Sequence, residues 1–98
     1  MEDSQIYLFY HWVLSPINYV LGILDVADLK GVGLTINEEE EINSMKNFSL
    51  DALERLKRFY KDPKNSEKII FLEEALKIDW KSFGELEKVI EDYHQRFP

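Results

Sequence analysis

The chain has 98 residues, of which 45% are hydrophobic and 13% aromatic, and its formal net charge is −7. This length and composition predict one domain with one core, and the aromatic share argues against a disordered acidic tail. The lack of cysteine excludes disulfide scaffolds and thiolate chemistry, and the excess of negative charge argues against a nucleic-acid binder.

The negative charge belongs to the first half of the chain. Residues 1–45 hold eight acids against Lys30 alone, whereas residues 46–98 hold eleven acids and eleven bases. Four of the acids are consecutive, from Glu38 to Glu41. This concentration singles out one region as a candidate for electrostatic recognition.

The first predicted element is an apolar helical hairpin over about residues 4–30. Ser15 and Pro16 have the order of a helix N-cap followed by proline at the first helical position, so the chain bends there, either between two helices or at a kink in one. An aromatic-rich strand over residues 7–14 is the competing interpretation. The helical spacing continues too far to favour it. Apolar residues at that spacing are Ile6, Phe9, Tyr10, Val13, Ile17, Val20, Leu21, Leu24 and Leu29.

The same region raises the question of a membrane span, because no Asp, Glu, Lys or Arg occurs from Ile6 to Leu24. Polar residues interrupt this stretch, and no basic residue flanks it before Lys30, which is unlike a spanning helix. We therefore expect a buried hairpin and no membrane partner. The acidic start, Glu2 and Asp3, lacks the positive region of a secretory signal, which favours a cytoplasmic location.

A loop over residues 31–35 separates this hairpin from an acidic-start helix or helices over about residues 36–61. Gly31 and Gly33 suit a helix C-terminus, and Thr35 with Glu38 forms a capping-box pattern. The apolar phase slips between Met45 and Leu50, where Ser49 could begin a fresh helix, with Asn47 and Phe48 in the break. Asp62-Pro63 ends the segment.

Two further helices are predicted over about residues 66–78 and 82–96. Asn65 or Ser66 starts the first, and Ser82 with Glu85 repeats the capping box before the second. Apolar residues of the last helix recur at spacings of three or four: Phe83, Leu86, Val89, Ile90, Tyr93 and Phe97. The fold class is therefore all-α, a single-domain helical bundle of about four to six helices.

The titratable residues give little support for an enzyme. His11 lies in an apolar run without a nucleophile or acid on its helical face, and His94 follows Glu91 in a Glu-x-x-His spacing that no second helix repeats. No phosphate-binding glycine motif occurs in the sequence. We expect no catalytic residues, no metal and no cofactor.

Two other clusters have structural interpretations. The basic cluster of Arg55, Lys57, Arg58 and Lys61 lies beside Asp51 and Glu54, so a solvated helix flank with a Glu54–Arg58 pair is favoured over a nucleic-acid site. Trp80 and Phe83 flank a short helix connection, where aromatic residues are more often part of the core than anchors for a partner.

The first functional hypothesis is a small binding protein that neutralises or regulates a basic protein partner. The acids supply complementary charge, and exposed aromatic residues anchor the interface. A short, acidic, cysteine-free helical chain is similar in composition to bacteriocin and toxin immunity proteins, which implies a partner such as a nuclease toxin. That similarity covers no motif and assigns no residue. The partner-binding residues we predict are Glu38, Glu39, Glu40, Glu41, Asp25, Asp28, Tyr7, Tyr10, Trp12 and Tyr19.

The alternative is a structural or self-associating module, a homodimer formed through the apolar N-terminal hairpin. Membrane association of the hairpin and a metal-dependent activity are weaker alternatives, because the charge pattern and the ligand count oppose them.

Overall fold

The chain folds into four helices in the computed structural model, which describes the backbone of residues 2–59 and 63–97 and the side chains of residues 11–58 and 66–97. The helices are α1 (Glu2–Lys30), α2 (Ile36–Phe59), α3 (Pro63–Ala75) and α4 (Phe83–Arg96). No strand occurs in the described backbone. The all-α prediction is confirmed, with four helices.

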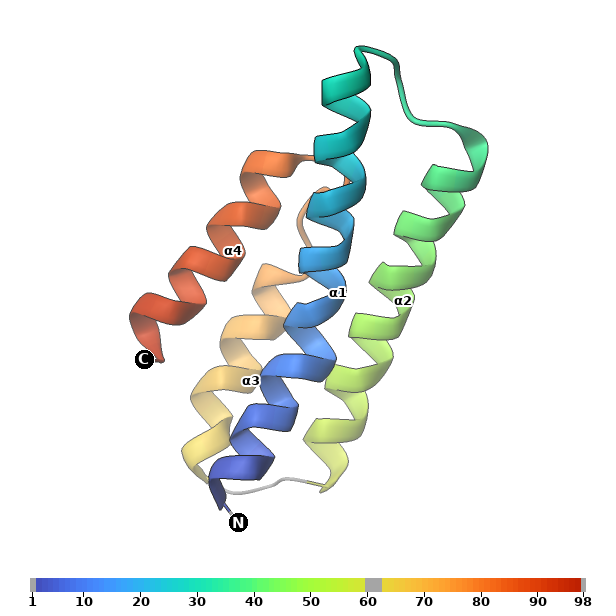
Figure 1. Cartoon of the computed structure of the whole chain (residues 1–98). Helices are drawn as coiled ribbons and strands as arrows, with labels where there is room; N and C mark the ends of the chain where they lie inside the picture. The colour runs from blue at the N-terminus through green and yellow to red at the C-terminus, as the bar shows by residue number, and fades with distance from the viewer. Residues whose placement is uncertain (1, 60–62, 98) are drawn as a thin grey trace.

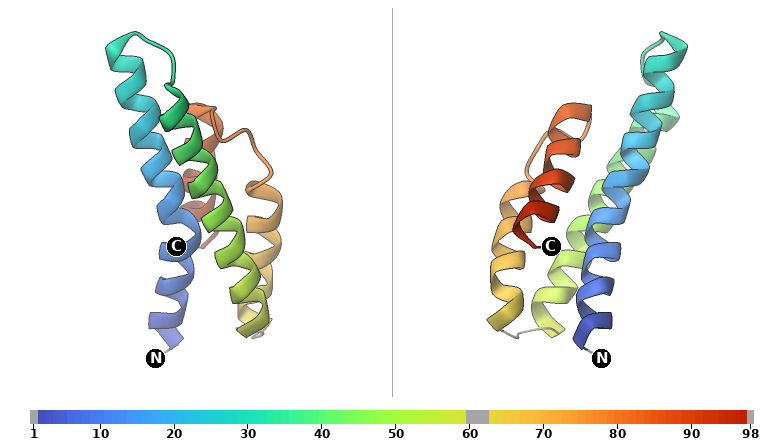
Figure 2. Two further views of the ribbon diagram at one scale, coloured as in Figure 1. Left: turned by 90° about the vertical axis from the view of Figure 1, so that its right-hand side faces the viewer. Right: turned by 60° about the vertical axis from the view of Figure 1, so that its left-hand side comes forward.

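The helices form two layers (Figures 1 and 2). α1 and α2 form a long antiparallel pair, and α3 and α4 lie against one side of it, α4 on α1 and α3 on α2. The molecule is elongated, with extents of 45 × 24 × 22 Å. The last turns of α1 and the loop to α2 project beyond the start of α4 (Figure 1), and we call this region the α1–α2 end.

The N-terminal apolar segment is one continuous helix, α1, with Pro16 inside it, so of the two interpretations the single helix is observed and the two-helix hairpin is wrong. Proline removes one backbone hydrogen bond and crowds the preceding turn, which normally breaks a helix. Here Pro16 is buried, and the neighbouring Val13 and Ile17 are fully buried in the core. Packing of this face holds the helix together across the proline.

Helix α2 is also continuous, so the single-helix alternative is observed and no fresh helix begins at Ser49. Ser49 is completely buried, and its hydroxyl donates a hydrogen bond to the carbonyl oxygen of Val13 at 2.6 Å. The interruption of the apolar pattern between Met45 and Leu50 is therefore due to Ser49, a polar residue in a core position. Its hydrogen-bond partner, Val13, lies on α1. A satisfied hydroxyl of this kind costs little to bury.

The helix ends follow the predicted capping chemistry closely. Gly31 has the left-handed φ of 69° that suits a helix C-terminus. The capping box before α2 is confirmed, because the Glu38 amide donates to the Thr35 hydroxyl at 3.1 Å and the Thr35 amide to the Glu38 carboxylate at 2.8 Å. Before α4 only half of the box forms, because Ser82 caps the Glu85 amide at 3.4 Å while the Glu85 carboxylate accepts from the Asp79 amide instead.

The boundaries of α3 differ by up to three residues from those predicted. α3 begins at Pro63, before the predicted Asn65 or Ser66, and ends at Ala75 rather than near residue 78. Proline is favourable at the first position of a helix because its missing N–H has no partner there. Pro63 therefore starts α3, and Asp62, where the preceding segment was predicted to end, lies outside the described residues.

All four helices contribute to one core. Trp80, between α3 and α4, is buried as predicted, and its indole N–H donates to the Leu76 carbonyl at 3.1 Å. Phe83 is 40% exposed, so its predicted core position is wrong, and Leu29 is 80% exposed on the outer face of α1. The largest fully buried apolar side chains are Val13, Leu14, Ile17, Val20, Ile42, Leu56, Leu72, Leu76 and Leu86.

Candidate functional site

The fold brings the predicted acids of two segments to one end of the molecule. Asp25 and Asp28 lie in the last turns of α1, and Glu38 to Glu41 lie in the first turns of α2, joined by the loop over residues 31–35. Lys30 is the only base among residues 1–45. The α1–α2 end is therefore strongly negative.

The four consecutive glutamates have different roles in the structure. Glu38 caps α2, and Glu39 pairs with Lys81 at 3.6 Å across the helix connection. Glu41 accepts a hydrogen bond from the Tyr19 hydroxyl of α1. Glu40 is exposed and has no ion pair or hydrogen bond to a side chain within the described residues. Most of the run is thus engaged within the chain, and Glu40 remains available to a partner.

These contacts shift two pKa values. The hydrogen bond from the Thr35 backbone amide, followed by the Thr35 hydroxyl interaction and the charge of Lys30, lowers the pKa of Glu38. The hydrogen bond to Glu41, followed by the negative charge of that carboxylate, raises the pKa of Tyr19. Both shifts belong to contacts that hold α2 in place, so they indicate structural roles.

The predicted aromatic anchors are spread along α1. Trp12 and Tyr19 are 42% and 52% exposed on the outer side of the helix. Tyr19 reaches the acids, because its hydroxyl donates a hydrogen bond to Glu41, whereas Trp12 is roughly 20 Å along the helix from Asp25, at 1.5 Å per residue. Tyr7 and Tyr10 belong to α1, but their side chains lie outside the described residues. Of the two described anchors, Tyr19 therefore lies beside an acid and Trp12 lies away from the acids.

Apolar side chains at the α1–α2 end were not predicted as site residues. Val32 is 62% exposed in the loop, and Ile36 is 76% exposed at the start of α2. Each is an isolated apolar residue beside glycine or a helix cap, so the sequence shows no periodic signal there. Their exposure follows from the projection of this end beyond α4.

Phe48 is a third exposed apolar residue that was not predicted as a site residue. It is 57% exposed on α2 and lies seven residues after Glu41, so both residues share one helical face. Because Glu41 contacts Tyr19, that face is the one beside the outer side of α1. Phe48 therefore extends the exposed aromatic region across two helices.

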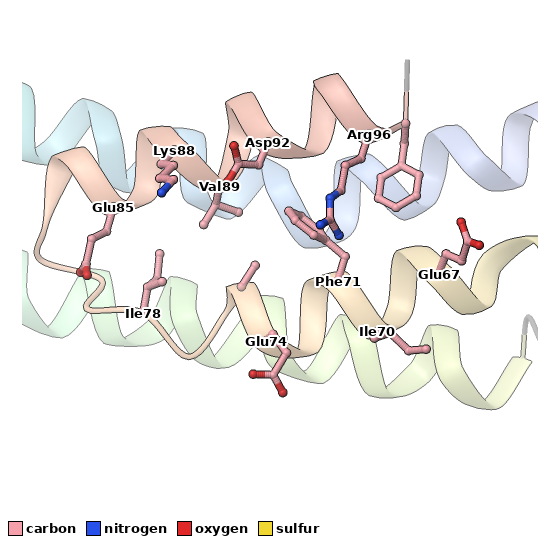
Figure 3. A pocket seen from close by; sticks show the side chains of 12 residues that line it. Glu67, Ile70, Phe71, Glu74, Ile78, Glu85, Lys88, Val89, Asp92 and Arg96 are labelled. Carbon is pink, nitrogen blue, oxygen red and sulfur yellow. The ribbon is translucent and has the colours of Figure 1, made fainter.

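A groove of about 830 Å³ separates α3 from α4 (Figure 3). Phe71, Ile78 and Val89 contribute apolar surface to it. One end is closed by aromatic packing, with Phe71 and Phe97 ring centroids 5.9 Å apart and Arg96 5.3 Å from the Phe71 centroid. Charges of both signs surround the groove, so it does not select a partner by charge. Its charged lining residues are Glu67, Glu74, Glu85, Lys88, Asp92 and Arg96.

The basic cluster is a solvated helix flank, as predicted, although its pairs differ. Arg55 contacts Asp51 at 3.2 Å, while Lys57 contacts Glu54 at 3.6 Å and Glu73 of α3 at 3.0 Å. The Glu73 contact is the main cause that raises the pKa of Lys57. Glu54 thus pairs with Lys57 rather than with the predicted Arg58. Lys61 lies outside the described residues.

Neither histidine belongs to a metal-binding group. Within the described part of the chain, no three His, Asp or Glu side chains gather closely enough to hold a metal ion. His11 and His94 both interact with neighbouring groups.

One helical stretch, from His11 to Lys30 in α1, is long and apolar enough to cross a membrane by length and composition alone. One third of it is buried inside the fold. An apolar core helix passes the same test, so the stretch is weak evidence for a membrane role.

Comparisons with protein-family models, with curated proteins and with solved structures found no match to this chain.

Proposed function

We propose that this protein is a binding module that docks a basic protein partner on the α1–α2 end. The observation that carries the proposal is the exposure of Val32 and Ile36, 62% and 76%, beside the exposed acids Asp25, Asp28 and Glu40. Exposed apolar side chains within a charged surround are typical of interaction sites. The negative surround specifies a positive partner.

The proposal is for binding rather than for catalysis. Of the titratable groups at this end, Glu38 serves as a helix cap and Glu39 and Glu41 serve as contacts between elements. The remaining acids are exposed, and exposed carboxylates steer association more than they perform chemistry.

The compositional similarity to toxin immunity proteins supports one particular partner. A nuclease toxin needs a basic surface to hold the nucleic-acid backbone. An acidic inhibitor that covers such a surface would block access to phosphate. A nuclease toxin is therefore the partner class that we propose, with neutralisation as the outcome.

Charge reversal with a matched control tests the proposal. The full chain is immobilised and exposed to host lysate, and each retained protein is purified and its affinity for the chain measured. The variant Asp28→Lys with Glu40→Lys should release a basic partner. The variant Glu87→Lys with Glu91→Lys makes the same change in net charge at exposed positions of α4 and should retain it. An acidic partner, or equal binding by both double variants, would refute the proposal.

Salt and an apolar substitution sharpen this experiment. Binding should weaken between about 0.05 and 0.5 M salt, because exposed charges are screened. Ile36→Ser leaves the net charge unchanged and should weaken binding while the salt dependence persists. If Ile36→Ser binds as tightly as the unsubstituted chain, the apolar residues have no part in docking.

A further inference from the structure

The outer face of α1 carries a continuous uncharged stripe. Its six members are exposed and alternate at spacings of three and four residues, the pattern of a helix–helix seam. We call them the α1 stripe: Trp12, Ser15, Tyr19, Gly22, Val26 and Leu29. They span 17 residue steps, roughly 25 Å of helix.

Apart from Tyr19, whose hydroxyl donates a hydrogen bond to Glu41, the fold of one chain does not account for this stripe. A surface helix ordinarily carries polar or charged residues on the side away from the core. Gly22 is especially informative, because glycine inside a helix is unfavourable relative to alanine. A Cβ atom at Gly22 would meet nothing within 4 Å in this chain. The monomer therefore gains nothing from glycine at this position.

We infer that the α1 stripe is covered by the α1 stripe of a second copy of this chain, packed antiparallel about a two-fold axis between Tyr19 and Gly22. This register places Trp12 opposite Leu29 of the partner subunit and Ser15 opposite Val26 of the partner subunit. Tyr19 then lies opposite Gly22 of the partner subunit. Each of the three pairs therefore sets a larger side chain against a smaller one.

The antiparallel direction follows from shape. A parallel pair would stack Trp12 on its own copy and Tyr19 on its own copy, and it would leave gaps where the serines and the glycines meet. The antiparallel register avoids both.

The area buried in the seam determines how tightly we expect the two copies to bind. Two helices in contact over this length bury less than about 1,200 Å², at the low end of specific interfaces. We therefore expect a dimer with a dissociation constant in the micromolar range. The surface is separate from Val32 and Ile36, so this inference goes beyond the proposed function and is independent of it.

Sedimentation of the full chain tests the dimer directly. The weight-average mass should rise from monomer towards dimer between about 1 and 500 μM, as a micromolar dissociation constant requires. Gly22→Leu should remain monomeric and folded, because the new side chain fills the place of Tyr19 from the partner subunit. Gly84→Leu is the matched control. Gly84 is also exposed, in the first turn of α4, and a Cβ there meets nothing within 4 Å.

Disulfide trapping tests the register, and the absence of native cysteine makes it specific. A mixture of Ser15→Cys and Val26→Cys chains should form the mixed disulfide under mild oxidation, because the two positions face each other. Ser15→Cys alone should not crosslink, because its two copies lie roughly 16 Å apart along the seam. A ready Ser15→Cys homodisulfide would overturn the antiparallel register.

Three other outcomes would overturn the dimer itself. One is a mass that stays monomeric at every concentration, and another is a Gly22→Leu chain that dimerises like Gly84→Leu. The third is binding of a monomer to phosphatidylcholine vesicles that Gly22→Leu leaves unchanged, because the stripe would then cover lipid. If the variant Asp28→Lys with Glu40→Lys no longer binds the basic partner, that result concerns the proposed function alone. The same variant should still form the dimer.

Discussion

Helices α1 and α4 both bury an apolar face, but their outer faces differ. α4 buries Leu86, Val89 and Tyr93 and turns charged residues such as Glu87 and Glu91 to solvent. α1 buries Val13, Ile17 and Val20 among others and turns an uncharged stripe, Trp12 to Leu29, to solvent. Folding of one chain explains the pattern of α4 apart from the exposed Phe83, but only half the pattern of α1.

The difference indicates where interactions beyond the single chain should be sought. A helix with one apolar face is fully satisfied by its own core, whereas a helix that is apolar on both sides has surface left over. In α1 the excess runs along the outer face and ends near the acids of the α1–α2 end. We therefore expect the buried faces of the two helices to contribute similarly to stability and their outer faces to differ.

The largest expected effect comes from the buried faces. Leu14→Ala in α1 and Leu86→Ala in α4 each remove most of a completely buried side chain. Each should lower the free energy of unfolding by about 2–5 kcal/mol, from the lost transfer energy and the cavity left behind. Urea titration followed by circular dichroism measures it. A loss well under 1 kcal/mol in only one of them would show that the two faces are packed differently.

The sequence predicts α4 better than α1, for the same reason. The residues of α4 and its Ser82 cap could be predicted because one periodic apolar face and one capping pattern agree over the whole helix. In α1 the periodic signal is obscured, since apolar residues surround the helix and Pro16 has the appearance of a helix start. Only tertiary packing decides that Pro16 lies inside one helix.

The candidate site could be predicted only in part. The acids were found because charge counts need no structure, and the loop over residues 31–35 brings them together. The exposure of Val32, Ile36 and Phe48 could not be found, because exposure depends on which helix ends lack a neighbour. Periodicity likewise grouped Leu29 with the core residues of α1, whereas it lies on the outer face of the helix and is 80% exposed.

The helix caps should give the next largest effect. Thr35→Ala removes the cap of α2 and Ser82→Ala removes that of α4. Each should destabilise the fold by about 1 kcal/mol, because an amide at the helix start loses its acceptor. Thr35→Ala should cost more than Ser82→Ala, since the Thr35 hydroxyl accepts its hydrogen bond at 3.1 Å and the Ser82 hydroxyl at 3.4 Å. Ser44→Ala, at an exposed position inside α2, is the control and should not destabilise.

A smaller effect is expected on the outer face of α1. Val26→Glu places a charge on an exposed part of the α1 stripe, and at low protein concentration it should change the free energy of unfolding by less than about 0.5 kcal/mol. Val89→Glu at the buried face of α4 should unfold the chain or come close to it. Chemical denaturation at a few micromolar compares them. Similar losses in both variants would mean that the outer face of α1 is part of the core.

The smallest effect is a pH dependence that distinguishes the two helix starts. The Thr35 hydrogen bonds lower the pKa of Glu38 below its ordinary value of 4.5. A carboxylate whose pKa is lower in the folded state stabilises the fold above the unfolded-state pKa. That contribution is lost as the pH falls through the folded-state value. Stability should therefore decline below about pH 4.5 partly through Glu38, and Glu38→Gln should make this decline shallower.

Urea midpoints at successive pH values measure this decline, with Glu40→Gln as the control because Glu40 lies in the same turn and makes no capping contact. If both substitutions flatten the acid decline equally, the effect comes from net charge at the α1–α2 end, and the Thr35 cap has no specific part in it.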